Sequence, residues 1–153
     1  MNRFAHMDLI KQFAHIIAEI PFNRTIGLKL GEIESDHITM YFSNSDALIG
    51  NYLHGILHGG VISSVLDMAG GAAVMAAIAI KHPDHNLEQL ASMLGKSSTI
   101  NLHIDFLRPG KGEHFTAKAF VLRSGSKISV TRMELLNDQS VLIATGAGTY
   151  LIA

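Results

Sequence analysis

A long apolar segment with a single charged residue constrains this chain more than any other feature. Residues 59–80 contain one charged side chain, that of Asp67, and they follow the turn His58-Gly59-Gly60. A carboxylate in such a segment is costly unless it is paired or takes part in chemistry. Two glycines at a helix start leave backbone N–H groups open to a ligand, and a helix N-terminus favours negative charge. The segment therefore predicts a buried helix with an oxyanion site at its start and a working carboxylate further along.

Hydrophobic periodicity predicts that β-strands surround this helix. Alternating apolar residues indicate strands at residues 37–44, 99–107, 116–123, 128–136 and 141–152, and residues 22–31 are expected to lead into a first extended stretch. Helical spacing predicts an amphipathic helix over residues 7–20, which Pro21 ends, and a short helix over residues 86–94. This order predicts an α+β fold, with an antiparallel sheet curled around one central helix. We expect one domain over residues 22–153 and an N-terminal helical extension over residues 1–21.

Glycines inside two of these elements predict close packing. Gly70 and Gly71 each cost the helix on the order of 1 kcal/mol. Close contact between the helix and the surrounding sheet would compensate for this cost. Gly146 and Gly148 lie on one face of the last strand, where a close neighbour is expected. In the strand at 99–107, alternation places Ile100, Leu102, Ile104 and Phe106 on one side.

Composition excludes several classes of protein. The formal net charge of −1 argues against a nucleic-acid binder. The absence of cysteine excludes disulfides and thiolate catalysis, and it fits a reducing compartment. Residues 1–20 do not read as a secretory signal, so we expect a cytoplasmic protein. Residues 59–80 are long enough to span a membrane, but the central carboxylate and the glycines favour a buried core helix, and no membrane span is expected.

Two other kinds of site have little support in the sequence. His54 and His58 are four residues apart, but no third ligand lies nearby, so no metal is expected. No Gly-x-Ser-x-Gly motif is present, and a serine-hydrolase mechanism therefore has no support.

Several motifs, in this order, resemble the hotdog-fold acyl-CoA thioesterases, and within them the phenylacetic-acid-type (PaaI-like) branch. They are His58-Gly59-Gly60 with Asp67, the sequence FLRPG at 106–110, GSK at 125–127 and ATGAGTY at 144–150. The resemblance covers about residues 22–153. It implies the hotdog fold and the hydrolysis of acyl-CoA thioesters without a cofactor, since coenzyme A belongs to the substrate. It also implies active sites between the subunits of a homodimer, and pairing of dimers into a homotetramer.

The resemblance also implies roles for individual residues. Asp67 matches the family's catalytic carboxylate, acting as general base or as nucleophile. The Gly59 amide of the partner subunit matches the group that polarises the thioester carbonyl. Thr99 aligns with a hydroxyl residue that positions water, and His58 is expected to orient the loop rather than to transfer a proton. Asn51 resembles the asparagine that orients the reacting groups, but it lies one residue too far from His58, which a one-residue bulge would correct.

The expected contacts to coenzyme A come from the helix start and from basic turns. Gly60 belongs to the predicted oxyanion turn. Arg108, Arg123, Ser126 and Lys127 are candidates for phosphate contacts, although ordinary exposed charge explains them equally well.

The sequence leaves the acyl group open among medium-chain, long-chain and aromatic substrates. Met68, Met75 and Met93 are candidates for lining an acyl pocket, although methionine is more often core filler. The stretch 81–94 is long for the branch and a candidate for shaping an acyl tunnel. Two alternative functions remain. The first is an acyl-thioester hydratase or dehydratase, against which the absence of proline in residues 50–65 counts. The second is a non-catalytic acyl-CoA binding module, against which the presence of Asp67 counts.

Overall fold

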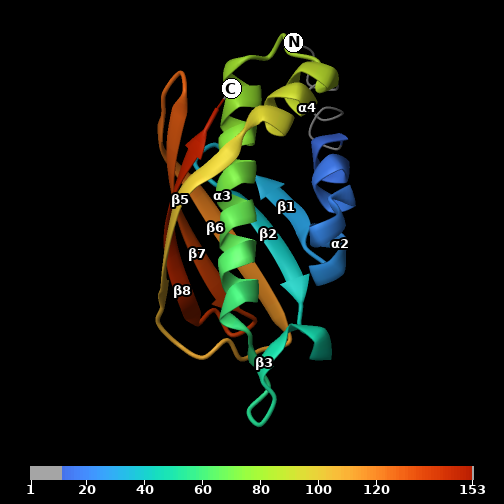
Figure 1. Cartoon of the computed structure of the whole chain (residues 1–153), viewed down its shortest axis with the longest axis vertical. Coiled ribbons are helices and arrows are strands. Elements are labelled where there is room, and N and C mark those ends of the chain that lie inside the picture. Colours follow the sequence, from blue (N-terminus) through green and yellow to red (C-terminus); the bar gives the residue numbers. More distant parts are fainter. Residues whose placement is uncertain (1–11, 153) are drawn as a thin grey trace.

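An antiparallel sheet wrapped around one long helix forms the body of the molecule (Figure 1). The computed structural model describes residues 12–152. The six strands lie in the order β1 (Lys29–Ile33), β2 (Ile38–Ser43), β6 (His114–Ser124), β7 (Ile128–Asn137), β8 (Leu142–Leu151) and β5 (Ser98–Phe106). A 3₁₀ turn (Asp46–Leu48) and a two-stranded ribbon of β3 (Ile49–Asn51) and β4 (Ile56–Leu57) precede the central helix. The predicted α+β architecture is confirmed.

The central helix is α3 (Gly59–Lys81), and eleven of its 23 residues are buried. Val65, Leu66 and Ala69 have no exposed surface and belong to one core with Met40 of β2 and Met133 of β7. By length and composition α3 is the one helix within residues 12–152 that could cross a membrane, but most of its apolar stretch is covered by the rest of the chain. Its hydrophobicity is accounted for by the protein core.

Two of the glycines predicted to have close neighbours, Gly70 and Gly148, pack against the ring of Tyr150 on β8. A Cβ atom at Gly70 would collide with the Tyr150 hydroxyl oxygen, and one at Gly148 would lie 2.7 Å from the same ring. The ring therefore fits between the backbones of α3 and β8 only because both positions lack a side chain. Gly71 differs, since a Cβ there would meet nothing closer than the Tyr150 ring at 3.7 Å, an ordinary contact.

The region before β1 departs from the prediction. Residues 12–19 are helical, Ile20 forms a bend, and a new helix α2 (Pro21–Ile26) begins at once. Pro21 occupies the first turn of α2, where its fixed φ suits a helix start, and Gly27 ends the helix in the left-handed conformation with φ of 69°. The sequence did not predict this helix, whereas the extended stretch into which residues 22–31 were expected to lead is present as β1. Residues 7–11 of the predicted first helix lie outside the described residues.

The predicted short helix after α3 is confirmed as α4 (Leu87–Lys96). Asn86 caps it by accepting a hydrogen bond from the Gln89 N–H, and the Gln89 side chain accepts one from the Asn86 N–H. This reciprocal pair is a capping box, which satisfies two backbone donors at the helix start. The helix crosses beside α3 and leads directly into β5 (Figure 1).

β5 is an edge strand with β8 as its single neighbour in the sheet. Leu102 and Ile104 are half-buried against the core, whereas Ile100 and Phe106 are each 55% exposed. The predicted apolar stripe is thus wrong at Ile100, where the strand is irregular and its register against β8 shifts. Phe106 remains on the α3 side, beside Gly59.

Candidate active site

The carboxylate of Asp67 lies on α3 opposite the start of β5. Thr99 donates a hydrogen bond from Oγ1 to Oδ1 of Asp67 at 2.9 Å. The second carboxylate oxygen, Oδ2, has no hydrogen-bond partner among the described residues. The Thr99 hydrogen bond therefore fixes one carboxylate oxygen. Because Asp67 is only half-buried, the other oxygen remains available to a ligand.

A β-bulge turns Thr99 toward Asp67. Thr99 pairs with Tyr150 and Asn101 pairs with Thr149, so β5 has one extra residue, Ile100, at this point. Regular alternation would place Thr99 on the opposite face from Leu102 and Ile104. The extra residue reverses this and brings the Thr99 hydroxyl to the inner face, as bulges beside functional sites commonly do.

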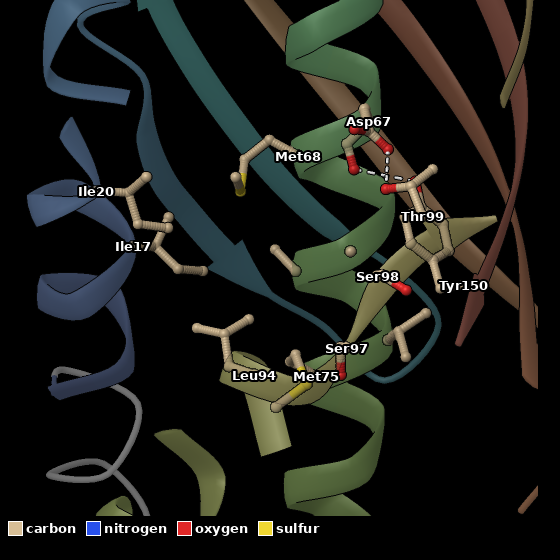
Figure 2. A pocket seen from close by; sticks show the side chains of 13 residues that line it. Ile17, Ile20, Asp67, Met68, Met75, Leu94, Ser97, Ser98, Thr99 and Tyr150 are labelled. Atoms are coloured by element: carbon tan, nitrogen blue, oxygen red, sulfur yellow. Dashed lines mark hydrogen bonds between the residues drawn. The ribbon is translucent and has the colours of Figure 1, made fainter. Parts of the chain in front are cut away.

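Tyr150 supports the backbone beneath the carboxylate. Its hydroxyl donates a hydrogen bond to the main-chain oxygen of Asp67 at 3.0 Å, and Figure 2 shows the ring beside Thr99. Burial raises the pKa of the Tyr150 hydroxyl, and the negative charge of Asp67 raises it further. Sequence reasoning did not select Tyr150, although the glycines at 70 and 148 signalled that something packs closely there.

The start of α3 is built around His58. His58 is the N-cap, and its Nδ1 accepts a hydrogen bond from the Gly60 N–H at 2.9 Å. The Gly60 amide is therefore occupied, whereas the Gly59 N–H has no hydrogen-bond partner within residues 12–152. Gly59 lies beside the ring of Phe106 and lines a depression of about 420 Å³ together with Leu107, Arg108 and neighbouring apolar residues.

Asp67 and Gly59 of one chain belong to different places on the surface. They are eight residues apart on one helix, which separates them by about 12 Å along its axis. A thioester carbonyl polarised by Gly59 is thus out of reach of the Asp67 carboxylate of the same chain.

The other predicted site residues divide between the two ends of α3. Asn51 is exposed on β3, near the helix start, and β3 contains the expected one-residue irregularity between Ile49 and Asn51. Arg108 is also at this end, where its guanidinium donates to the Leu142 carbonyl oxygen at 2.9 Å.

Arg123, Ser126 and Lys127 lie at the opposite end. They belong to the β6–β7 hairpin, whose Ser124 carbonyl oxygen contacts Lys81 Nζ at the last residue of α3. The length of α3, about 33 Å, therefore separates this hairpin from Arg108.

The described part of the chain holds no group of three or more His, Asp or Glu side chains placed to bind a metal. His54, half of the pair considered as a zinc site, is exposed in the turn between β3 and β4, and His58 is engaged in capping.

The antiparallel sheet curled around one enclosed helix has the architecture of the hotdog fold. The Thioesterase superfamily model matches residues 54–144. The chain belongs to this family.

Individual relatives agree with this assignment. The chain is 38% identical over 136 residues to the medium/long-chain acyl-CoA thioesterase YigI of Escherichia coli, covering 89% of this chain and 88% of the relative. It is similar to a crystal structure from Shewanella oneidensis described as related to the thioesterase superfamily, with 36% identity, a TM-score of 0.90 and full coverage of both chains. The PaaI protein of the Escherichia coli phenylacetic acid degradation operon shares the fold, with 22% identity, a TM-score of 0.74 and 95% and 94% coverage. The resemblance to the hotdog-fold acyl-CoA thioesterases is confirmed.

Proposed function

We propose that the chain hydrolyses acyl-CoA thioesters at a site shared between two subunits, with Asp67 of one subunit and the Gly59 N–H of the other acting on the same substrate. The observation that carries the proposal is the contrast between the two groups. Asp67 has one carboxylate oxygen held by Thr99 and one free, and the free Gly59 amide lies about two helical turns away on the same helix.

The exposed edge of β5 is the surface through which two subunits can bring the Asp67 carboxylate of one and the Gly59 amide of the other together. An unpaired edge strand with apolar side chains is a natural surface for self-association. Thr99 at the start of β5 contacts Asp67, and Phe106 at its end contacts Gly59. If two β5 strands pair antiparallel about a twofold axis at His103, Leu102 of one chain lies opposite Ile104 of the other, and the extra residue Ile100 then brings Thr99 opposite the partner's Phe106. The Asp67 carboxylate of one subunit then faces the Gly59 amide of its partner.

The same pairing brings the basic residues together. The β6–β7 hairpin lies beside the end of β8, which pairs with the start of β5. A twofold axis through the centre of β5 therefore places Lys127 of one subunit at the same end of the site as Arg108 of the other. Arg108, Arg123 and Lys127 are candidates for the coenzyme A phosphates in that arrangement. Assembly of two such dimers into a tetramer remains part of this proposal.

The chemistry follows from the positions of the donors and acceptors. Oδ2 of Asp67 accepts a proton from water, and the water oxygen attacks the thioester carbonyl carbon. The Gly59 N–H and the helix dipole stabilise the resulting oxyanion. The C–S bond then breaks, and the proton passes to the coenzyme A sulfur, so that the products are a free acid and coenzyme A. Direct attack by Asp67 on the carbonyl is the variant of this mechanism that the same geometry permits.

Release of free thiol from a panel of short, medium, long and aromatic acyl-CoAs tests the proposal. We expect turnover by the wild type and a loss of about 10²- to 10⁴-fold in kcat in Asp67→Asn, which keeps the size of the side chain and removes its basicity. Tight binding of acyl-CoA without any turnover by the wild type would instead identify a binding module.

A further inference from the structure

An apolar cavity opens directly beside the Asp67 carboxylate. It has a volume of about 170 Å³ and lies between residues 12–20, α3, α4 and the start of β5. Figure 2 shows Asp67 and Thr99 at one end and Leu94 and Met75 at the other, with Ile17 on the side. The cavity thus leads from the reacting carboxylate into a space walled mainly by hydrocarbon.

We propose that this cavity receives the acyl chain of the substrate, and that α4 and residues 12–20 set the longest chain that fits. The proposal rests on the proposed function, because it takes the thioester to lie at Asp67. The polar groups of the cavity are concentrated near Asp67 and at Ser97 and Ser98, and among residues 12–152 no lysine, arginine or histidine lines it. A straight hydrocarbon chain matches this lining, whereas a charged acyl group does not.

Small residues on α3 create the space. Gly71 and Ala72 face the cavity, and a Cβ atom at Gly71 would meet only the edge of the Tyr150 ring. Larger side chains at these two positions would fill the volume between α3 and the opposite wall. The helix therefore combines one glycine needed for Tyr150, Gly70, with a second that leaves room for a ligand.

The cavity wall formed by residues 12–20 is held in place by a hydrogen bond from α2. Asn23 of α2 is fully buried, and its Nδ2 donates a hydrogen bond to the Ile17 carbonyl oxygen at 2.8 Å. Ile17 itself is 1% exposed. A buried hydrogen bond of this kind fixes the backbone that presents Ile17 and Ile20 to the cavity. The side wall is therefore anchored to the core.

The far wall is formed by the end of α4. Leu94 is half-buried and lines the cavity, and the following turn is secured by the Ser97 N–H and hydroxyl, which both donate to the Met93 carbonyl oxygen. Leu87 lies on the same helix and is also half-buried, but it does not line the cavity. The two leucines therefore provide a matched pair for substitution.

Chain-length profiles of paired variants test the proposal. Each methylene that enters the cavity should raise kcat/KM by about fourfold, until the far wall is reached. We expect Leu94→Ala to move the preferred straight chain to greater length, and Leu94→Phe to move it to shorter length with at least a tenfold loss for the longest substrates. Ala72→Leu should act like Leu94→Phe from the α3 side. Leu87→Ala and Leu87→Phe should leave the profile of the wild type unchanged.

The possible outcomes distinguish a failure of the cavity proposal from a failure of the proposed function. Hydrolysis by the wild type with the same chain-length profile in both Leu94 variants would overturn the cavity proposal and leave the proposed function standing. Equilibrium binding of the same acyl-CoAs to Asp67→Asn gives a second readout that needs no turnover. In that background, Leu94→Phe should weaken binding of the longest chains at least tenfold and leave short chains unaffected. Equal binding of all lengths would overturn the proposal even if no substrate were hydrolysed.

Discussion

At the scale of single residues, the proposed mechanism gives the two oxygens of the Asp67 carboxylate different roles. Oδ1 accepts the Thr99 hydrogen bond, while Oδ2 is left for water. Tyr150 fixes the main chain at the same residue through its hydroxyl, which also lies close enough to the carboxylate to interact with it. The two supporting residues are therefore expected to differ, because loss of Thr99 acts on catalysis and loss of Tyr150 acts on stability.

Thr99→Val should lower kcat by about ten- to a hundredfold, because a hydrogen bond to a charged group contributes about 1.5–3 kcal/mol. The variant keeps the shape of the side chain, so its melting temperature should stay close to that of the wild type. Steady-state kinetics with one good acyl-CoA substrate measure the effect. An unchanged kcat would show that Thr99 does not orient the reacting carboxylate.

Tyr150→Phe should change how stability depends on alkaline pH. Burial holds the pKa of the Tyr150 hydroxyl above its ordinary value of about 10. The unfolded chain therefore releases this proton first, and folding stability falls as the pH rises above about 10. Denaturant midpoints between neutral and strongly alkaline pH should fall less steeply in Tyr150→Phe than in the wild type. Tyr41→Phe, at an exposed position, is the control and should follow the wild type.

Asp67 and the start of α3 could be selected from the sequence because their motif is local. The lone carboxylate and the His-Gly-Gly turn lie within ten residues of one another. Tyr150 was missed because its role comes from a contact 83 residues away in the chain. The family resemblance selected the Gly59 amide, but the reason that it is free while the Gly60 amide is not depends on where the His58 ring turns, which the sequence does not indicate.

At the scale of elements, α3 is shaped by two glycines with different neighbours. Gly70 is packed against Tyr150 and Thr131, whereas Gly71 faces the cavity. Identical substitutions at adjacent positions should therefore have opposite effects on stability.

Gly70→Ala should destabilise the protein by about 1–3 kcal/mol, because the new methyl group overlaps the Tyr150 hydroxyl. Gly71→Ala should be neutral or stabilising by up to about 1 kcal/mol, because alanine favours the helix and meets no close atom. Urea denaturation of the two variants measures both effects. Equal destabilisation by the two changes would contradict the packing described for Tyr150.

Most elements could be predicted from periodicity, and the exceptions have local causes. The strands β2, β6, β7 and β8 alternate clearly and were predicted. The helix α2 was missed because Pro21 was interpreted as ending a helix, although proline is equally suited to starting one. The bulge at Ile100 has no sequence signal, because it becomes visible only in the register of β5 against β8.

At the scale of the whole molecule, the proposed dimer makes one exposed edge, that of β5, responsible for both assembly and function. The start of β5 is next to Asp67 and its end is next to Gly59, so antiparallel pairing of two such strands completes two sites at once. In the proposed arrangement a single chain contributes to both sites and completes neither alone.

Ile100→Glu should weaken self-association and activity together. Ile100 is 55% exposed on the β5 edge, and a charge there would be buried or repelled in the pairing proposed. Sedimentation should detect a shift toward monomer, with a parallel loss of thioesterase activity although Asp67 is intact. Leu122→Glu, at an exposed position on β6 away from this edge, should remain at least dimeric and active. A fully active monomer would contradict the shared site.

The central claim is that Asp67 and Gly59 act from different subunits, and tagged heterodimers test it most directly. One heterodimer combines an Asp67→Asn subunit with a Gly59→Val subunit, whose new side chain fills the space at the helix start. The other combines a wild-type subunit with a subunit that carries both changes. If the site is shared, the first heterodimer has one intact site and should show about half the wild-type activity, while the second should show almost none. The reverse result, activity in the second heterodimer and none in the first, would place both groups in one subunit and contradict the account.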